Sequence, residues 1–450
     1  MNTMIDTQRT AEAKAQQLNL DAFWMPFSGN RAFKAAPRLI AEAEGAWFTD
    51  TRGNKLFDSL SGLWCTGLGH KHPKINEAIT HQLNILDFAP GFQMGHPLAF
   101  ELAERLARLA PADLNRVFFT NSGSECTDTS LKMARAFWRA KGKPEKTKLI
   151  GRARGYHGVN MGGTSLGGIG GNRKHYGQLL DADHLPHTLL AENAFSKGQP
   201  EYGVELADHL LQMIELHDAS NIAAVIVEPM AGSAGVIVPP LGYLQRLREL
   251  CDQHDILLIF DEVITGLGRM GAMFGAEAFG VVPDIMNLAK QLTNGVIPMG
   301  AVIAKDHIYQ AFMDQPGPDY MVEFPHGYTY SGHPVACAAA MASLDVLVDE
   351  DMPGQVRTLM PVFEEQIHRL KGLPHVVDIR NCGLAGAVQL APYPGEPARR
   401  PMELALSLWQ QGYYVRFGGD TLQFGPPFIS TPDELEQLFN AVHRTLKAQS

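Results

Sequence analysis

The feature that most constrains the fold is an alternation of short apolar runs with longer amphipathic stretches, between Asn115 and about Ala304. The stretch GYLQRLRELCDQHD between two of these runs carries Leu244, Leu247 and Cys251 at helical spacing, which predicts a βαβ crossover. Such alternation is typical of a mostly parallel α/β sheet. In chain order the predicted strands are VFFT, KLIG, AAVIVE, ILLIF, DIMNLA and MGAVIA.

The two ends of the chain have a different texture. A long helix is predicted from Pro334, followed by further helices and by the short strands VVDIRN, AGAVQL, YYVRF and TLQFG. The segment WFTDTRGNKLFD, which starts at Trp47, is typical of a hairpin and is expected to join this C-terminal part. At 450 residues the chain is too long for one compact core. We therefore predict a large α/β domain at 71–333 and a small α+β domain at 334–450, joined by the N-terminal segment 1–70.

Composition excludes several classes of function. The net charge of −10 is modest for this length, and no block of Lys or Arg predicts a nucleic-acid partner. The five cysteines are odd in number, widely spread and without metal-ligand spacing, which indicates reduced thiols. The polar start of the chain carries no targeting signature. The most apolar helical stretch, Val335 to Leu344, is too short to span a membrane. We expect a cytoplasmic protein without membrane or metal partners.

Two residues of opposite charge follow neighbouring apolar runs. Asp261 ends ILLIFD, and Lys290 follows DIMNLA, 29 positions later (290 − 261). This arrangement suits pyridoxal phosphate, because a lysine can form a Schiff base with its aldehyde while an acid keeps the pyridine nitrogen protonated. A lysine after an apolar stretch is also commonly a solvated surface group. Other motifs must therefore decide between the two interpretations.

The segment TNSGSE, from Thr120 to Glu125, follows a predicted strand and opens a predicted helix. Backbone N–H groups at a helix start bind anions, and the helix dipole adds to this attraction. Ser122, Gly123 and Ser124 are therefore candidate phosphate ligands. An ordinary helix N-cap at Ser122 or Ser124 explains the same residues.

Two further motifs stand at the carboxyl ends of predicted strands, where open α/β sheets bind ligands. Tyr156 and His157 in GRARGYHG could lie flat on a planar cofactor, although such a pair is commonly ordinary packing. Glu228 in VEPMAGSAGV could be a cap for the next helix, but Pro229 and a long glycine-rich loop follow it and favour a place in the site.

A glycine pattern in TGLGRMG, formed by Gly266, Gly268 and Gly271, superficially resembles a dinucleotide-binding fingerprint. That fingerprint needs glycines directly after the strand and a helix packed on it. Here DEVIT intervenes, and MGAMFGAEAFGVVP is a poor helix start. The pattern does not predict a nicotinamide cofactor.

Taken in order, NSGSE, GRARGYHG, VEPMAGSAGV, FDEVITGLGRMG, AKQLTNGVIPMGA and HGYTYSGHPVACAAA resemble the class III aminotransferases of the pyridoxal-phosphate fold type I superfamily. The likeness extends over essentially the whole chain. LDAFWMPFSGN, SGLWCTGLGH and YVRFGGDTLQFGPPF resemble the ω-amino acid (β-alanine):pyruvate aminotransferases within that class. One departure is Cys126-Thr127, where relatives commonly carry an alanine and another small residue.

The resemblance implies a role for each matching position. Lys290 would carry the cofactor and Asp261 would pair with its pyridine nitrogen, while Tyr156 and Val263 would enclose the ring. Thr329, in HGYTYSGHP, would reach the phosphate in the neighbouring subunit, which implies a homodimer with shared active sites and leaves a homotetramer open. The positions expected to contact substrate are Trp64, Arg416, Gln423, Phe23 and Phe88.

The implied reaction moves an amino group from β-alanine, another ω-amino acid or a primary amine to pyruvate, giving L-alanine by a ping-pong scheme. Another class III enzyme remains an alternative. It could be an aminotransferase of the GABA or ornithine type that uses 2-oxoglutarate, or it could be a mutase or decarboxylase with the same cofactor. A cofactor-dependent repressor would need a DNA-binding extension, for which the short N-terminus offers no helix-turn-helix. A catalytically inactive scaffold is disfavoured by the intact Lys290 and Asp261.

Overall fold

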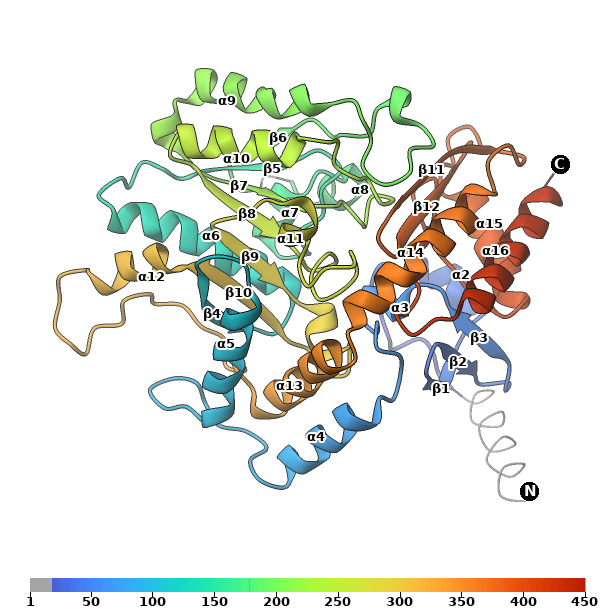
Figure 1. The fold of residues 1–450 in the computed structure, drawn as a ribbon, viewed down its shortest axis with the longest axis horizontal. Helices are drawn as coiled ribbons and strands as arrows, with labels where there is room; N and C mark the ends of the chain where they lie inside the picture. Colours follow the sequence, from blue (N-terminus) through green and yellow to red (C-terminus); the bar gives the residue numbers. More distant parts are fainter. Residues whose placement is uncertain (1–17, 178, 450) are drawn as a thin grey trace.

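A seven-stranded sheet forms the centre of the larger part of the molecule (Figure 1). The computed structural model describes residues 18–177 and 179–449, so the polar start of the chain lies outside the described residues. The strand order is β4-β10-β9-β8-β7-β5-β6. Their bounds are β4 (Leu114–Thr120), β5 (Lys148–Arg152), β6 (Ala182–Leu185), β7 (Ile222–Val227), β8 (Leu257–Asp261), β9 (Ile285–Leu288) and β10 (Gly300–Lys305).

The prediction of a mostly parallel sheet is confirmed, with one strand reversed. Strands β6, β5, β7, β8 and β9 are parallel neighbours, whereas β10 is antiparallel to both β9 and β4. Only residues 289–299 connect β9 to β10. A parallel return needs a crossover of about a dozen residues or more, usually a helix, so this short connection reverses the strand. Because β4 is also antiparallel to β10, it runs in the same direction as β9.

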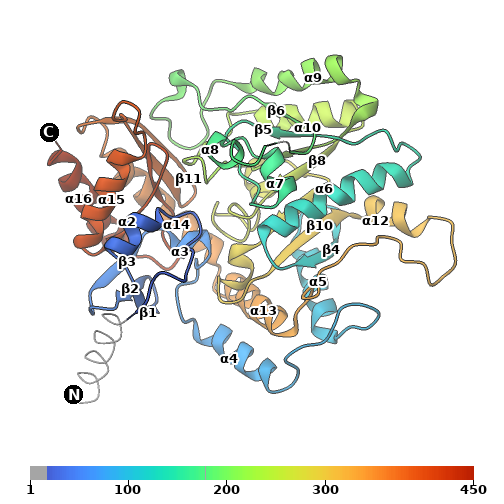
Figure 2. The same cartoon turned by 180° about the vertical axis from the view of Figure 1, so that it is seen from behind.

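Helices cover both faces of this sheet (Figures 1 and 2). Leu131 of α6 (Gly123–Ala140) shares one core with Ile226 of β7. Leu247 of α10 (Tyr243–Gln253) shares the other core with Val225, the preceding residue of the same strand. Successive strand residues point to opposite faces, so the fully buried β7 reads as a continuous apolar run. The predicted crossover helix between β7 and β8 is confirmed as α10.

Other helices of this part are α4 (Pro73–Leu83), α5 (Pro97–Leu109), α7 (Met161–Leu166), α8 (Gly170–Arg173), α9 (His209–His217), α11 (Gly275–Phe279) and α12 (Asp306–Met313). The short 3₁₀ helices are η1 (Ala191–Asn193), η2 (Val204–Asp208), η3 (Ala219–Asn221) and η4 (Lys290–Thr293). The glycine pattern of TGLGRMG lies in turns, and only the short α11 follows it. Among the described residues, no helix combines the length and the apolar character that crossing a bilayer requires.

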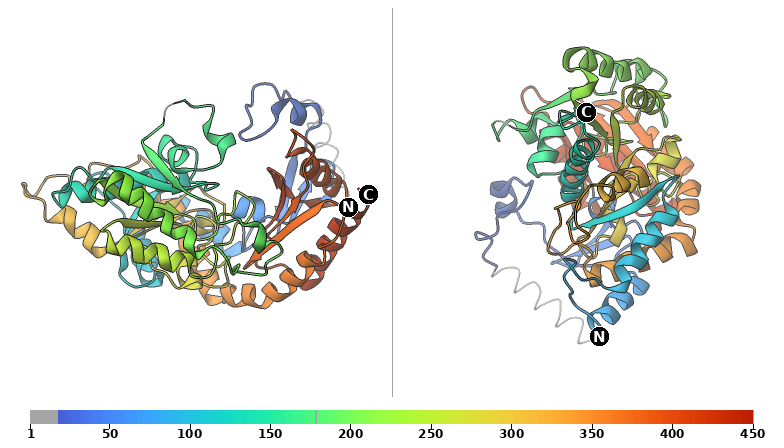
Figure 3. Two further views of the ribbon diagram at one scale, coloured as in Figure 1. Left: turned by 90° about the horizontal axis from the view of Figure 1, so that it is seen from above. Right: turned by 90° about the vertical axis from the view of Figure 1, so that its left-hand side faces the viewer.

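The blue N-terminal and red C-terminal segments lie together at one end of the molecule (Figure 3). This smaller part contains two four-stranded sheets. One has the order β1-β2-β3-β13, with β1 (Ile40–Glu44), β2 (Trp47–Asp50), β3 (Lys55–Asp58) and β13 (Tyr413–Tyr414). The other has the order β11-β12-β15-β14, with β11 (Val376–Cys382), β12 (Ala385–Leu390), β15 (Thr421–Phe424) and β14 (Arg416–Gly418). Its helices are α2 (Asn30–Ala35), α3 (Ser61–Trp64), α14 (Met352–His368), α15 (Arg399–Gln410) and α16 (Pro432–Lys447).

A strand from each end of the chain lies in one sheet, because β3 pairs in parallel with β13. The prediction of YYVRF as one strand is wrong, because β13 and β14 belong to different sheets and the chain turns from one to the other at the buried Val415. Helix α13 (Pro334–Asp349) is the predicted long helix, and it packs against α4 and α5. The domain boundaries at 70/71 and 333/334 stay predictions.

Candidate active site

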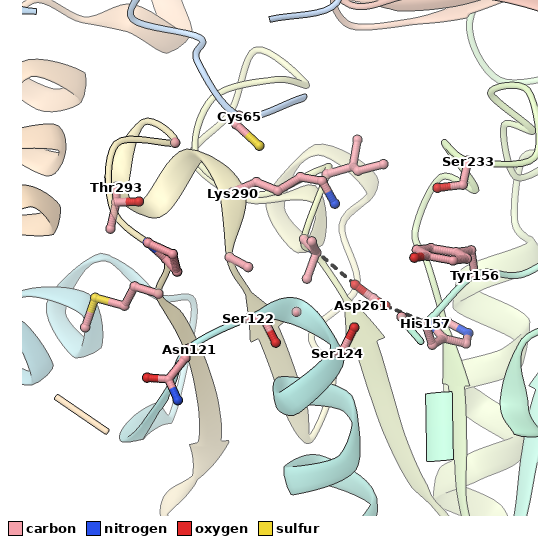
Figure 4. Close-up of a pocket in the computed structure, with 18 of the residues that line it drawn as sticks. Cys65, Asn121, Ser122, Ser124, Tyr156, His157, Ser233, Asp261, Lys290 and Thr293 are labelled. Carbon is pink, nitrogen blue, oxygen red and sulfur yellow. Dashed lines mark hydrogen bonds and ion pairs between the residues drawn. The ribbon is translucent and has the colours of Figure 1, made fainter. Parts of the chain in front are cut away.

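Six strands, β4 to β9, run in the same direction and end at one edge of the large sheet, and the candidate site residues follow five of them, β4, β5, β7, β8 and β9. Ligands bind at this edge in open α/β sheets. The residues at or after these strand ends surround a cavity of about 280 Å³ (Figure 4). Its walls include Ser122, Tyr156, Glu228, Asp261 and Lys290. The structure therefore brings together side chains that are far apart in the sequence.

Lys290 begins η4 directly behind β9, and its side chain extends into the cavity (Figure 4). Its φ of 47° lies in the left-handed region, which costs a residue with a side chain on the order of 1–3 kcal/mol. Within the described part of the chain the Lys290 ammonium makes no hydrogen bond or ion pair. A strained backbone that presents an unpaired amine to a cavity is typical of a functional site rather than of a surface lysine.

Asp261 ends β8 and is almost completely buried. Its Oδ2 accepts a hydrogen bond from Nδ1 of His157 over 2.8 Å, and its Oδ1 accepts one from the Val263 N–H over 3.2 Å. Both donors fix the direction of the carboxylate at the cavity floor. His157 therefore lines the cavity next to Tyr156 and also binds Asp261 through Nδ1.

Glu228 follows β7 and bonds across to the GRARGYHG loop, not to a following helix. Its Oε1 accepts the N–H of Tyr156 over 2.9 Å, and its carbonyl accepts an Arg152 guanidinium N–H over 2.8 Å. Burial raises the pKa of Glu228 to about 7, with Asp261 acting in the same direction and His157 and Arg152 opposing it. The interpretation of Glu228 as a helix cap is wrong, and the residue orders the loop that carries Tyr156.

The sequence left open whether the first residues of α6 cap their helix or line a binding site, and the structure shows that they do both. Ser122 is an N-cap, since its Oγ accepts the Glu125 N–H over 3.2 Å. Ser124 Oγ accepts the Val159 N–H over 3.0 Å. All of Ser122, Gly123 and Ser124 nevertheless line the cavity. The first N–H groups of a helix have no partner within it, so this end of the cavity has the chemistry to bind an anion.

Cys126 lies one turn into α6 and faces away from the cavity, into the sheet. Its thiol is fully buried and lies 3.0 Å from Thr120 Oγ1 and 3.2 Å from the Leu288 carbonyl oxygen. A Cβ built on Gly300 of β10 would come within 2.5 Å of this sulfur. Burial raises the pKa of Cys126 to about 12, so the thiol stays protonated. Cys126, where this sequence differs from its relatives, therefore packs beneath the start of the helix and does not contact the cavity.

The cavity fits pyridoxal phosphate. Its donor set provides an anion site at the start of α6, a fixed carboxylate at Asp261 and an unpaired amine at Lys290. Tyr156 and Val263 both line it and leave space for a planar ring. Gly123 is also constrained, because a Cβ there would come within 3.0 Å of a methyl carbon of Val263.

A second cavity of about 600 Å³ opens beside the first, and the two share Tyr156, Ser233 and Lys290 as walls. Trp64 and Arg416, two of the positions expected to contact substrate, line it. The Nε of Arg416 is buried and has no hydrogen-bond partner among the described residues. Arg416 lines this cavity beside Lys290, and its guanidinium makes no hydrogen bond or ion pair within the described part of the chain.

The other expected substrate positions lie outside both linings. Gln423, the β15 partner of Arg416 in register, is fully buried and donates from Nε2 to the Ser233 carbonyl over 3.2 Å. Phe23 is 65% exposed. Phe88 packs its ring 5.8 Å from that of Tyr330. Their roles toward substrate stay predictions.

Thr329 lies in an exposed turn and is absent from the cavity lining of its own chain. The neighbouring residues anchor this turn to the outside of α6. His326 Nε2 lies 2.8 Å from Thr129 Oγ1, and the Tyr328 hydroxyl donates to the Glu125 carbonyl over 3.4 Å. The turn is therefore held in place while Thr329 itself faces outward.

The sequence analysis missed several lining residues, among them Phe27, Arg154 and Ser233. Phe27 stands in the same segment as Phe23, and its ring lies 6.5 Å from that of Tyr156 in an edge contact. No periodicity separates two phenylalanines of an irregular segment, so only the fold identifies the one that reaches the site. Ser233 lies in the glycine-rich loop after Glu228, and that loop was the available signal.

Comparison with known proteins agrees with this geometry. Residues 29–446 match the family model of the class III aminotransferases. The chain is 65% identical over 433 residues to a β-alanine–pyruvate aminotransferase of Pseudomonas aeruginosa, covering 96% of this chain and 97% of the relative. It is 62% identical to an ω-amino acid–pyruvate aminotransferase of Pseudomonas putida, with the same two coverages.

A crystal structure of an amine transaminase from an uncultivated Pseudomonas species, in its PLP-bound form, superimposes with a TM-score of 0.87 at 37% identity. That match covers 96% of this chain and 99% of the other. The protein therefore belongs to the class III aminotransferases, which are enzymes that depend on pyridoxal phosphate. The resemblance, the fold class and the cofactor predicted from the sequence are confirmed.

Proposed function

We propose that this enzyme moves an amino group from β-alanine, from other ω-amino acids or from primary amines to pyruvate and forms L-alanine in a ping-pong reaction. The observation that best supports this proposal is the pair of joined cavities, in which Lys290 stands between the cofactor-binding residues and Arg416. The names of the similar Pseudomonas enzymes support pyruvate as acceptor and an ω-amino acid as donor. No residue of the described chain favours a mutase or decarboxylase instead.

Pyridoxal phosphate, when bound, withdraws electrons from the amine-bearing carbon and makes its proton acidic. In our proposal the residues that hold it are Ser122, Gly123, Ser124, Tyr156, Glu228, Asp261, Val263 and Lys290, with Thr329 added from a second subunit. The first turn of α6 binds the phosphate, and Asp261 keeps the pyridine nitrogen protonated. Glu228 contributes indirectly by holding the Tyr156 backbone at 2.9 Å.

Lys290 is the proposed catalytic base. Its Nζ removes the proton from the amine-bearing carbon of the donor and later returns a proton to the carbon that becomes C2 of alanine. The left-handed backbone at Lys290 directs the side chain into the cavity, where the amine that acts as base has no competing partner among the described residues. Such positioning reduces the entropy lost at each proton transfer.

Arg416 is the proposed carboxylate-binding residue. A guanidinium binds a carboxylate through two parallel hydrogen bonds, and both β-alanine and pyruvate carry one. A long side chain can also turn aside when a donor has an apolar group in its place. Gly418 and Gly419, which line the same cavity, leave space for that movement. Trp64, Phe23 and Gln423 are the further proposed substrate positions.

We further propose a cytoplasmic homodimer with shared active sites, with a homotetramer as an open extension. The fixed, outward turn at Thr329 supports this, because Thr329 does not reach the cavity of its own chain. Phe88 lies beside Tyr330 in the same turn, so we place it at the active site of the other subunit. Exposed apolar side chains near this surface include Phe92, Met94 and Tyr330.

A donor and acceptor panel tests the proposed function. The holoenzyme is incubated with β-alanine, GABA, putrescine or a benzylic amine, and with either pyruvate or 2-oxoglutarate. We expect alanine from pyruvate with β-alanine, and much slower formation of glutamate from 2-oxoglutarate. A preference for 2-oxoglutarate would instead indicate an enzyme of the GABA or ornithine type.

A further inference from the structure

The indole of Trp64 is enclosed by residues outside the cavity that it lines. We infer that Ser61, Arg269 and Gly425 are positioning residues that hold Trp64 as a rigid wall of the substrate cavity, and that they thereby limit the size of the group on the amine-bearing carbon of the donor. This inference rests on the proposed function, because it concerns the choice of donor by the same site.

The backbone that carries Trp64 is strained. Ser61 and Trp64 have φ values of 49° and 65°, in the left-handed region that residues with side chains rarely adopt. Both carboxylate oxygens of the buried Asp58 hold this turn, one accepting the Leu60 N–H over 3.1 Å and the other the Gly62 N–H. Strained backbone persists only where its surroundings fix it. The turn therefore presents the indole in one orientation.

Gly425 lies against the face of the indole. A Cβ built on Gly425 would come within 2.5 Å of the Trp64 Cε3 and closer still to Cζ3. The Gly425 backbone cannot retreat freely, since its N–H donates to the Ser59 carbonyl over 2.8 Å. Its carbonyl accepts the Ser61 hydroxyl, also over 2.8 Å. Glycine is therefore required here for close approach of the ring, not for a special backbone conformation.

Arg269 encloses the indole from another side. Its guanidinium carbon lies 5.7 Å from the Trp64 ring centroid and 4.6 Å from that of Phe428. The side chain is 1% exposed and donates to Ser61 Oγ over 2.9 Å and to the Pro426 carbonyl over 2.6 Å. Within the described residues no carboxylate forms an ion pair with Arg269. Its guanidinium instead donates to backbone carbonyls and to Ser61, and lies over the rings of Trp64 and Phe428.

Another side of the indole is the cavity itself. Because Gly425 and Arg269 occupy two sides of the ring, we expect a ring displaced from Gly425 to move toward bound substrate. Added volume at position 425 should therefore narrow the cavity, although no residue at 425 lines it. This predicts a selective effect on bulky donors that depends on the presence of the indole.

The test compares Gly425→Ala in two backgrounds, the natural chain and Trp64→Ala. The donors are β-alanine and its 3-phenyl derivative, which differ only by a phenyl group on the amine-bearing carbon. The second-order rate constant of each donor half-reaction is measured with the holoenzyme. For a donor that does not react, its inhibition of the half-reaction with β-alanine is measured instead. The preference is the rate constant for the phenyl derivative divided by that for β-alanine. In the natural chain, Gly425→Ala should lower this ratio at least about fivefold, within the usual cost of overpacking. In the Trp64→Ala background the same change should alter the preference less than about twofold.

A structural readout accompanies the kinetics. The ¹⁹F resonance of 5-fluorotryptophan at position 64, assigned by its loss in Trp64→Phe, should shift in Gly425→Ala. If Gly425→Ala does not fold, Ser61→Ala replaces it, because it removes the bonds to Arg269 and Gly425 without adding volume. It should broaden the same resonance and raise acceptance of the phenyl donor.

Equal effects of Gly425→Ala on both donors, or equal effects in both backgrounds, would overturn the inference. An unshifted resonance for Gly425→Ala, or an unchanged resonance and preference for Ser61→Ala, would also overturn it. These results differ from failure of the proposed function, in which the unaltered holoenzyme would not react with β-alanine at all.

Discussion

Nδ1 of His157 lies 2.8 Å from Oδ2 of Asp261, and both side chains are buried at the floor of the cavity. The second carboxylate oxygen is also occupied, by the Val263 N–H. A buried carboxylate with a donor on each oxygen keeps one orientation. Asp261 is thus held to present its charge in one direction, and His157 is the side chain that holds it.

The first prediction concerns this pair. Asp261→Asn preserves the shape but removes the charge, and we expect turnover to fall by at least about a hundredfold, which is typical of losing one preorganised electrostatic group. His157→Asn retains Asp261 but removes one charged hydrogen bond, so a loss of about ten- to a hundredfold is expected. Steady-state alanine formation measures both. A change of less than about threefold for Asp261→Asn would mean that Asp261 only ends its strand.

The second prediction concerns Lys290. Lys290→Ala should still bind pyridoxal phosphate through α6 and Asp261, but it should lack turnover and the visible absorbance of the lysine-bound cofactor. Borohydride reduction followed by peptide mass spectrometry should place the cofactor on the peptide containing Lys290 in the unaltered enzyme only. Normal turnover in the variant, or a label on a different lysine, would contradict the assignment.

The parts of the site that were predictable from sequence lie directly behind buried strands. Strands β7 and β8 are buried along their whole length, so a charged residue at their ends is conspicuous, as Glu228 and Asp261 were. The direction of the sheet then places both at the same edge. Lys290 follows β9 in the same manner. These three residues can therefore be grouped from the strand pattern alone, without knowledge of tertiary contacts.

The rest depended on tertiary structure. The reversal of β10 follows from the length of one connection, and the division of YYVRF into β13 and β14 follows from pairing with β3 and β15. Neither changes the local apolar pattern. Phe27 lines the cavity because of where an irregular segment crosses Tyr156, and no local pattern distinguishes it from Phe23. Residues that act across a subunit interface leave no local signal at all.

The third prediction tests the shared site. Hybrid dimers of Thr329→Asp and Lys290→Ala subunits are purified through two different tags. If Thr329 serves the neighbouring subunit, one of the two sites in each hybrid has an intact Lys290 and an intact Thr329, so hybrids should show about half of the unaltered activity. Each variant alone should be nearly inactive. Hybrids no more active than Thr329→Asp would place Thr329 in its own site, and a fully active monomer would also contradict the prediction.

The fourth prediction concerns pH. Burial raises the pKa of Glu228 from 4.5 to about 7, so the unfolded chain releases this proton at a lower pH than the native protein. The free energy of unfolding must then fall as pH rises between these two values. Glu228→Gln has no carboxyl group to titrate, so its free energy of unfolding should not fall for this reason. At about 1.36 kcal/mol per pKa unit, its stability relative to the unaltered protein should rise by up to roughly 3 kcal/mol from pH 4.5 to pH 7.

Chemical denaturation of the cofactor-free protein at fixed concentration measures this difference. Glu101→Gln, at an exposed position of α5, is the matched control and should show no such trend. A stability difference between Glu228→Gln and the unaltered protein that stays constant from pH 4.5 to pH 7 would show that Glu228 is ionised in the native protein throughout.

The last prediction concerns Arg416, whose buried Nε has no hydrogen-bond partner among the described residues. It lines the cavity that shares Lys290 with the cofactor site. A structural arginine at such a depth would be expected to bind protein carbonyls or carboxylates, as Arg269 and Arg380 do. The Arg416 guanidinium makes no hydrogen bond or ion pair within the described chain, which favours recognition of a substrate carboxylate.

Arg416→Ala should therefore raise the Michaelis constants for pyruvate and β-alanine by about ten- to a hundredfold, which corresponds to losing roughly 1.5–3 kcal/mol of charged hydrogen bonding. The donor half-reaction of an aryl amine without a carboxylate should change far less, because it never used the guanidinium. Pre-steady-state kinetics of the two donors separate these effects from the acceptor step. Arg399→Ala, at an exposed pair with Glu396 and Glu403 on α15, provides the control for loss of a positive charge. Equal losses for both donors would make Arg416 a structural residue and place the carboxylate site elsewhere, with Arg154 on the same cavity wall as the next residue to test.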